Sequence, residues 1–157
     1  MSGNGFGGLD KLLESLSSIK DDKDRLFIKI TKHMTADFLA EVKKRTPVGQ
    51  GVKANVKGRL VTIAQGGTLR RNWRAGNIQK SGSYWTSTVY NPTEYASYVE
   101  YGHRQTPGRF VPAIGKRLKR SWVEGQHMMQ ISADNVIERS ESYIKVQVET
   151  FFKERFK

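Results

Sequence analysis

The sequence predicts an α+β fold in which long helices from the two ends of the chain, with a short central helix, pack on a small antiparallel sheet. Apolar residues recur at helical spacing near both ends, and a stretch rich in β-branched and aromatic residues lies between them. Few strands with long flanking helices are typical of this class. The 157 residues have the length of one domain, so we expect a single domain over 1–157.

The chain opens with a glycine-rich segment, residues 1–8, which we expect to be flexible. Apolar spacing then predicts one helix over Leu9–Ile19 and a second over Asp24–Arg45. The acidic residues around Asp21 favour a new helix start, because the helix dipole attracts negative charge to an N-terminus. Pro47 is expected to end the second helix.

Residues 49–67 form a glycine-rich segment that contains Lys53, Lys57 and Arg59 and no acidic residue. Alternation near its end leaves a short strand or hairpin open, but we favour a mobile loop. A loop of this length inside a small domain is usually functional or disordered. Its basic side chains are candidates for a channel lining or a contact with a partner.

The next segment reads as two strands of an antiparallel hairpin, over residues 68–76 and 84–90. Asn91-Pro92 then predicts a helix with Asn91 as N-cap and Glu94 bonding back to it. Gly102 is expected to end this helix in the left-handed conformation. Tyr95, Tyr98 and Val99 either pack this helix on the sheet or contribute to a contact with a neighbour.

Three elements are expected after the central helix. Arg109–Val111 reads as an edge strand, residues 113–122 as a short basic helix, and residues 132–156 as a long amphipathic helix.

Positive charge is concentrated in the middle of the chain. The net charge is +12, yet between Val42 and Val123 sixteen lysines and arginines accompany only Glu94 and Glu100, which gives this span +14. The two ends together carry −2. Such asymmetry indicates a polyanionic partner, either nucleic acid or an acidic protein surface. No apolar run approaches the roughly 20 residues of a membrane span, so no membrane contact is expected.

The side chains that could catalyse a reaction or bind a metal do not form any recognised motif along the sequence. There is no cysteine, the three histidines share no ligand spacing, and neither a phosphate-binding glycine loop nor a nucleophile elbow occurs. We therefore predict no catalytic residue, no metal site, no cofactor and no enzymatic activity.

The positive charge of the chain supports nucleic-acid binding, whereas its sequence motifs do not. Basic residues flank Trp73, Tyr84 and Trp85, a pattern that suits phosphate contacts and base stacking. No helix-turn-helix, zinc finger or RNA-recognition motif accompanies it, and the alternation of these aromatic residues favours core packing. A basic nucleic-acid-binding module without enzymatic activity remains the alternative function.

The chain also resembles the head–tail joining proteins of long-tailed bacteriophages, the neck or tail-completion group described as phage tail components. The resemblance spans roughly residues 25–155. Its motifs are Thr46-Pro47-Val48, Gly67–Trp73, Val89–Pro92 leading into Tyr95–His103, Arg109–Ala113, and the long C-terminal helix. The family commonly joins the Thr-Pro-Val turn almost directly to the Gly-x-Leu-Arg strand, whereas about 18 residues intervene here, Gly49–Gly66.

This resemblance implies a structural virion protein, assembled in the host cytoplasm, that forms a homo-oligomeric ring between the DNA-filled head and the tail. Its partners would be adjoining connector or head-closure proteins, tail tube or tail terminator proteins, and genomic double-stranded DNA, contacted without sequence specificity in the channel.

A closed ring needs a heterologous interface, and interface cores favour tyrosine, tryptophan and arginine. We therefore expect the loop after Gly102, His103–Pro112, to contact a neighbouring subunit or an adjoining ring, with Pro107 and Pro112 lowering the entropy lost on docking. Glu100 has two alternatives: an ion pair with Arg104 that anchors this loop, or one with an arginine of a neighbour. The expected interface residues are Tyr98, Glu100, Tyr101, His103, Arg104, Arg109 and Phe110. Arg70, Arg71 and Arg74 are expected to contact phosphates or an acidic partner.

Overall fold

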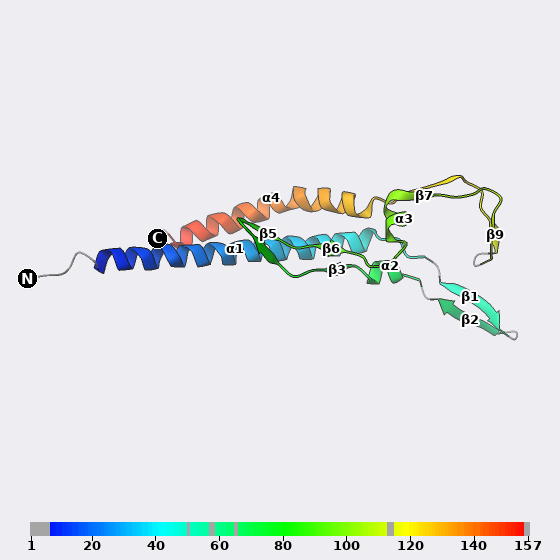
Figure 1. Cartoon of the computed structure of the whole chain (residues 1–157), viewed down its shortest axis with the longest axis horizontal. Coiled ribbons are helices and arrows are strands. Elements are labelled where there is room, and N and C mark those ends of the chain that lie inside the picture. The colour runs from blue at the N-terminus through cyan, green and yellow to red at the C-terminus, as the bar shows by residue number, and fades with distance from the viewer. Residues whose placement is uncertain (1–6, 50, 57–58, 65, 113–114, 156–157) are drawn as a thin grey trace, which may run out of the picture.

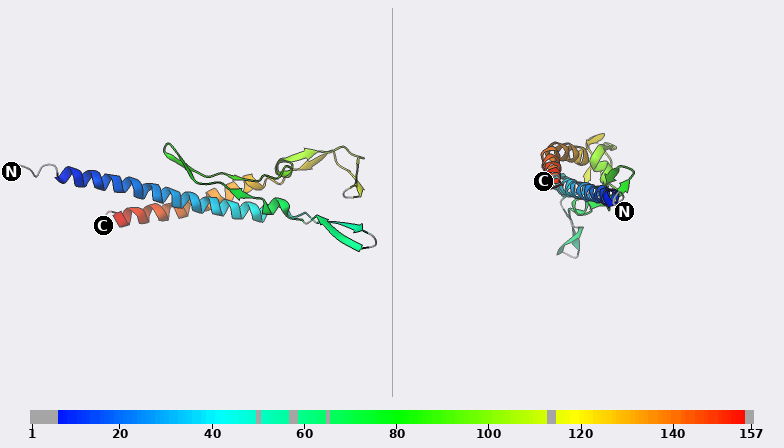
Figure 2. Two further views of the ribbon diagram at one scale, coloured as in Figure 1. Left: turned by 60° about the horizontal axis from the view of Figure 1, so that its bottom comes forward. Right: turned by 90° about the vertical axis from the view of Figure 1, so that its left-hand side faces the viewer.

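The computed structural model describes residues 7–49, 51–56, 59–64, 66–112 and 115–155. The molecule is elongated, with two long helices side by side and antiparallel, and with two β-projections that leave the same end of the helix pair (Figures 1 and 2). The long helices are α1, Gly7–Arg45, and α4, Met128–Arg155. The predicted α+β class is confirmed, although the described strands pair only two by two instead of forming one sheet. The expected flexible residues 1–6 lie outside the described part, and Gly7 and Gly8 belong to α1.

The prediction of two N-terminal helices is wrong, because α1 is one helix of 39 residues, about 58 Å long. No glycine or proline interrupts the chain between Ile19 and Asp24, so the acidic residues there do not begin a new helix. Asp22 pairs instead with Arg25 at 3.5 Å and with Arg155 of α4. The acidic run therefore links the two long helices. The C-terminal helix was predicted correctly, apart from its start four residues earlier.

The core is small and lies where the two long helices meet the middle of the chain. Val42, Leu69, Trp73 and Met128 form its buried cluster. Fully buried Thr46 joins the parts around it, since its hydroxyl donates to the Val42 carbonyl at 2.6 Å and accepts from Trp73 Nε1 at 2.7 Å. Satisfying the Trp73 indole in this way allows a large amphipathic ring to be buried.

The segment after the core departs in part from the two predicted strands. Thr68–Arg71 is the short helix α2, followed by β3, Arg74–Ala75. The alternating pattern of residues 68–76 suggested a strand, but it is short. The helical turn of α2 buries Leu69 in the core, and this packing determines the local structure. The antiparallel hairpin itself is confirmed: β3 pairs with β6, Val89–Tyr90, and β4, Gln79–Ser81, pairs with β5, Tyr84–Thr86.

The predicted capping of the central helix is also wrong. Helix α3 is Ala96–Tyr101, with Tyr95 at its N-cap. The Asn91 side chain accepts from the Thr93 N–H at 3.1 Å and donates to the Leu69 carbonyl at 2.8 Å, so it joins the segment to α2. At the other end, Gly102 has the expected positive φ of 83°, but its ψ of 173° is extended and leads the chain straight into a strand.

That strand begins a projection that we call the arm, Gly102–Glu124. Its base pairs β7, Gly102–Arg104, with β10, Trp122–Glu124, and its outer part pairs β8, Phe110–Val111, with β9, Lys116–Arg117. The expected edge strand is therefore present. The expected helix over 113–122 is wrong: Ala113 and Ile114 lie outside the described residues, and the remainder returns as the second side of the ribbon.

The second projection is a hairpin of β1, Val52–Val56, and β2, Arg59–Ala64. It diverges from the arm (Figure 2). The favoured interpretation of residues 49–67 as a loop is therefore wrong over most of its length, and the hairpin that the alternation left open is present. Arg59 is exposed on β2, Lys53 belongs to β1, and Lys57 lies outside the described residues.

Candidate assembly surfaces

Glu100 secures the root of the arm to α4. Its carboxylate accepts from the Met129 N–H at 3.1 Å with both oxygens, and the residue is 5% exposed. A carboxylate at a helix N-terminus satisfies an otherwise unpaired N–H and complements the helix dipole. Glu100 thus caps a helix 29 positions further along the chain, a partner that the sequence alternatives of an ion pair with Arg104 or a neighbour's arginine did not include.

The arm leaves this root through a very close backbone approach. A Cβ atom on Gly102 would lie 2.4 Å from the Val123 carbonyl oxygen, and one on Gly125 would lie 2.2 Å from the Glu100 carbonyl oxygen. The Gln126 N–H donates to the Val99 carbonyl at 2.8 Å, and the His127 N–H donates to the Glu100 carbonyl at 3.1 Å. The arm is therefore anchored by backbone hydrogen bonds. These bonds require the two strands to approach closely at Gly102 and Gly125, where a side chain would not fit.

The tyrosines around α3 face outward. Tyr95 is 46% exposed, and Tyr98 and Tyr101 are more exposed still, whereas Val99 packs against the core cluster. The Tyr98 ring meets the His103 ring edge-on, with centroids 5.8 Å apart. Core packing therefore accounts for Val99 only, and the exposed tyrosines form an aromatic surface at the base of the arm.

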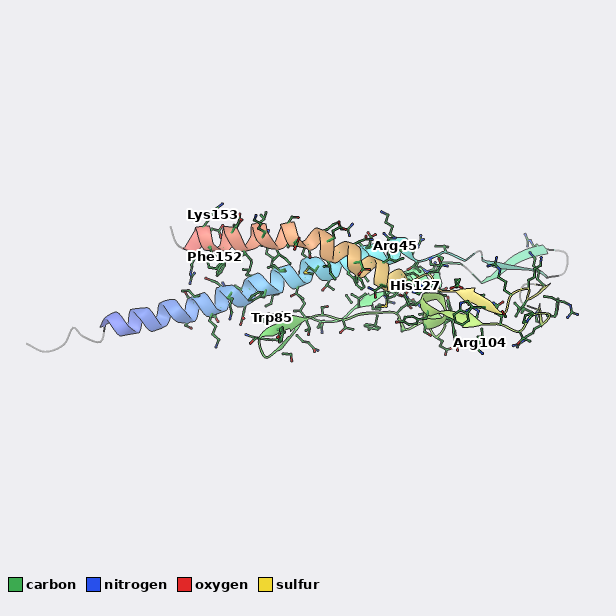
Figure 3. The ribbon with its side chains drawn as sticks, turned by 90° about the horizontal axis from the view of Figure 1, so that it is seen from above. Arg45, Trp85, Arg104, His127, Phe152 and Lys153 are labelled. Carbon is green, nitrogen blue, oxygen red and sulfur yellow. The ribbon has the colours of Figure 1, made fainter. Side chains whose placement is uncertain are left out.

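The arm itself is basic and aromatic. Its outer part includes exposed Arg109 and Phe110, and the Arg117 guanidinium lies 6.0 Å from the Phe110 ring centre while donating to the Gly108 carbonyl at 2.7 Å. Arg104 is exposed on β7 at the base of the arm, at the same end of the molecule as His127, which precedes α4 (Figure 3). The structure thus carries Arg104, Arg109 and Phe110 on one projection.

The other predicted arginines divide into two kinds. Arg70 donates to the Thr46 carbonyl from Nε and from a terminal nitrogen, at 3.0 and 2.7 Å, and Arg71 donates to the Gly66 carbonyl at 2.9 Å. Both therefore hold the ends of the segment that carries the β1–β2 hairpin. Arg74 is exposed on β3. Of the aromatic residues weighed for base stacking, Trp73 is buried and Tyr84 is 74% exposed.

Two carboxylates fix the outer elements to α1. Asp24 accepts from Lys80 of the β4–β5 hairpin at 2.5 Å, and the Lys80 ammonium lies 5.2 Å from the Trp85 ring centre. Figure 3 shows Trp85 on the hairpin beside α1. The hydrogen bond from Lys80 lowers the pKa of Asp24, against a smaller opposing effect of burial. No pattern along the chain marks this contact, because its partners lie 56 positions apart.

The second carboxylate, Glu41, lies between Arg45 at 3.0 Å and Arg139 of α4 at 3.5 Å. Burial alone would raise the pKa of Glu41, but the hydrogen bond from Arg45 and the charge of Arg139 outweigh burial and lower it. Along the described residues, no three histidine, cysteine or acidic side chains are grouped so as to hold a metal ion. No helix in the part of the chain that the structure describes is long and apolar enough to cross a membrane.

The amino-acid sequence was compared with known protein families, curated proteins and solved structures. Residues 10–102 match the model of the HK97-gp10-like family, described as "Bacteriophage HK97-gp10, putative tail-component". The chain belongs to the HK97-gp10-like family. This confirms the resemblance to phage tail proteins, and membership makes the chain a phage tail component that acts in the virion among other virion proteins. No curated protein and no solved structure matches the chain.

The match to the HK97-gp10-like family covers α1, the β1–β2 hairpin and the central elements, and it ends at Gly102. The arm beyond Gly102 and the whole of α4 therefore lie outside the matched region. Arg104, Arg109 and Phe110, which the sequence placed in an interface, belong to this outer part.

Proposed function

We propose that the chain forms a homo-oligomeric ring in the neck of a long-tailed phage, between the DNA-filled head and the tail, with the genome passing through its channel. The observation that carries this proposal, beside family membership, is the imbalance between core and surface. Among the residues whose burial the structure describes, few hydrophobic ones are buried: Ile30, Val42, Leu69, Trp73, Met128 and Val136. In the same described part, large hydrophobic residues that remain exposed are more numerous and occur on both long helices, the β4–β5 hairpin and the arm.

A single elongated subunit with so small a core gains little from hydrophobic burial, since burial contributes roughly 25 cal/mol per Å² of apolar surface. Exposed aromatic and aliphatic side chains in this number are typical of surfaces that become buried on association. Assembly into a ring would cover them, because each subunit meets two neighbours through two different patches. The role is structural and non-enzymatic.

The charge distribution supports contacts at one end of the subunit. Both basic projections leave the same end of the helix pair (Figure 1). In this proposal the ring meets a connector or head-closure protein on one side and a tail tube or tail terminator protein on the other. The β1–β2 hairpin, which bears Arg59, reaches either the channel or the partner ring on the head side. A channel lined uniformly by positive charge would retard DNA, so docking on an acidic ring accounts better for most of the basic residues.

A phage that lacks this gene tests the proposal directly. Electron microscopy of the lysate should show DNA-filled heads and separate tails that do not join, and expression of the wild-type chain in trans should restore whole particles. Labelled chain should then be found at the head–tail junction of the restored virions. Normal tailed particles in the absence of the gene would contradict the proposal.

The basic arm favours one alternative, a nucleic-acid-binding module without enzymatic activity. Under the ring proposal, the free chain binds duplex DNA weakly and without sequence preference. Binding isotherms for duplexes of unrelated sequence, measured over a series of salt concentrations, separate the two. Tight, strongly salt-dependent binding with a marked sequence preference would favour the alternative.

A further inference from the structure

We propose that the arm of one subunit docks on the outward face of α4 in a second copy of this chain, with Phe110 seated in the apolar groove beside Ile137. This inference rests on the ring of the proposed function and names the two surfaces that would form its repeating contact. The arm beyond Gly102 and helix α4 lie outside the region that matches the family, whereas the α1 and hairpin walls of the groove lie within it.

The donor surface is the arm. It carries a single acidic residue, Glu124, at its base. Its basic residues are all exposed: Arg104, Arg109, Lys116, Arg117, Lys119 and Arg120. Phe110 is 50% exposed near the outer end, and Trp122 is 41% exposed at the base. A combination of arginines with exposed aromatic rings is characteristic of the core of protein interfaces.

The acceptor surface is an acidic face on α4, formed by Asp134, Glu138, Glu141 and Glu149. Their spacing of three, four and eight residues places them on one side of the helix, together with Lys145. All four are exposed, whereas Met128, Ser132 and Val136 occupy the opposite, buried side of α4. The acidic face therefore points away from α1.

Two arginines of α4 do not neutralise this acidic face. Arg139 pairs with Glu41 at 3.5 Å, and Arg155 pairs with Asp22, so both are directed toward α1. These two positive charges of α4 are thus used within the subunit, and among the described residues no ion pair joins the acidic face to α1. The result is a negative surface on a chain whose middle is strongly positive.

An apolar groove borders the acidic face. It has a volume of about 420 Å³ between α1, α4 and the β4–β5 hairpin. Its apolar walls include Met34, Phe38, Trp85, Val89 and Val136. Ile137, which is 62% exposed, lines the groove and lies one helical turn before Glu141. A cavity of this size accommodates an aromatic side chain, and Ile137 joins the groove to the acidic face.

The arm cannot reach this surface within its own subunit. It extends beyond the end of the helix pair, whereas α4 runs from the root of the arm in the opposite direction (Figures 1 and 2). An arm-to-α4 contact between copies is heterologous, which is the kind of contact that closes a ring. Duplex DNA would satisfy the arginines of the arm but offers no apolar groove for Phe110, so a second copy is the better partner.

Charge reversal tests this contact in the full-length protein. Native mass spectrometry should show self-association of the wild type, weakened about tenfold or more by Arg109→Glu with Lys116→Glu, or by Glu138→Lys with Glu141→Lys. Combining all four substitutions in one chain should restore association to within a few-fold, because each reversed arm then meets a reversed acidic face. Lys20→Glu with Lys32→Glu, two exposed α1 positions, is the control of equal charge change and should associate like the wild type.

A cross-link provides an independent measurement if a charge variant fails to fold. The chain contains no cysteine, so Phe110→Cys with Ile137→Cys introduces a single pair. Oxidation should give a ladder of covalent oligomers, and neither single variant should extend beyond a dimer.

Three results would overturn the inference: a combined variant as weak as or weaker than the separate ones, the absence of a cross-linked ladder, or an arm reversal that abolishes DNA binding and leaves association unchanged. The last result would assign the arm to DNA. None of them removes the chain from the neck in the gene-deletion experiment, so failure of this contact is distinguishable from failure of the proposed function.

Discussion

At the scale of single residues, Glu100 and Glu94 differ sharply although they lie on the same short segment. Glu100 is buried and caps α4, whereas Glu94 is exposed. Replacing Glu100 with alanine leaves the Met129 N–H without its partner, at a cost of about 1–3 kcal/mol in the free energy of unfolding. Urea denaturation followed by circular dichroism measures this loss. Glu94→Ala is the control and should change the free energy by no more than about 0.5 kcal/mol; equal effects would refute the capping role.

Gly102 and Gly108 form a second matched pair at this scale, since both have a φ of 83°. A Cβ at Gly102 meets the Val123 carbonyl oxygen at 2.4 Å, whereas nothing lies within 4 Å of one at Gly108. Gly108→Ala should cost about 1–2 kcal/mol, for the left-handed backbone alone. Gly102→Ala should cost clearly more, because the two strands at the root of the arm must also separate. Similar melting temperatures for the two variants would show that the close approach is not needed.

At the scale of elements, Asp24 should make the attachment of the β4–β5 hairpin depend on acidity. Its pKa is lowered from the ordinary 3.8 by Lys80, so the attachment contributes fully above that value and is lost as the pH falls through the lowered pKa. Trp85 lies beside this contact. Its fluorescence should therefore change on acidification below about pH 3.8, and Asp24→Asn should show the released signal already at neutral pH. A variant with the same pH profile as the wild type would contradict this assignment.

Sequence periodicity predicted the elements whose signal is long. The apolar spacing of α1 and α4 repeats over many turns and predicted helix along both, although α1 was wrongly divided at Asp21. The hairpin of residues 74–90 has both turn residues and β-branched strands. Short signals failed where a distant contact determined the local structure. Asn91 is a good N-cap by type, but Leu69 of α2 takes its side chain instead. Likewise, residues 113–122 contain nothing that reveals the pairing of Lys116–Arg117 with β8.

The candidate surfaces were predictable to a similar degree. The sequence identified the basic and aromatic stretch from Tyr98 to Phe110, because composition alone distinguishes it. It did not reveal the acidic face of α4, although the spacing of Asp134, Glu138 and Glu141 was readable once the helix was assigned. The apolar groove could not be predicted, since it needs α1, α4 and the hairpin placed together.

At the scale of the whole molecule, the two ends of the segment that carries the β1–β2 hairpin lie so close together that the chain could be joined without it. Gly49 and Gly66 approach so closely that a Cβ on Gly66 would lie 1.8 Å from the Gly49 carbonyl oxygen. Deleting Val52 to Gln65 should therefore leave the melting temperature of the purified chain nearly unchanged. Phage that carry the deletion should fail to produce DNA-filled, tailed virions, as judged by electron microscopy. Normal virions would show that the hairpin has no part in assembly, and a large drop in melting temperature would show that it supports the fold.

The pairing of α1 with α4 has a consequence for the order in which the chain folds. The ribosome makes α1 first, but α4, the long helix that packs along it, begins only at Met128. Contacts between segments so far apart in sequence form late, because closing the intervening chain costs entropy before any contact compensates for it. A newly made α1 therefore lacks its long helical partner during most of synthesis, and its side toward α4 stays exposed to aggregation until that helix has emerged.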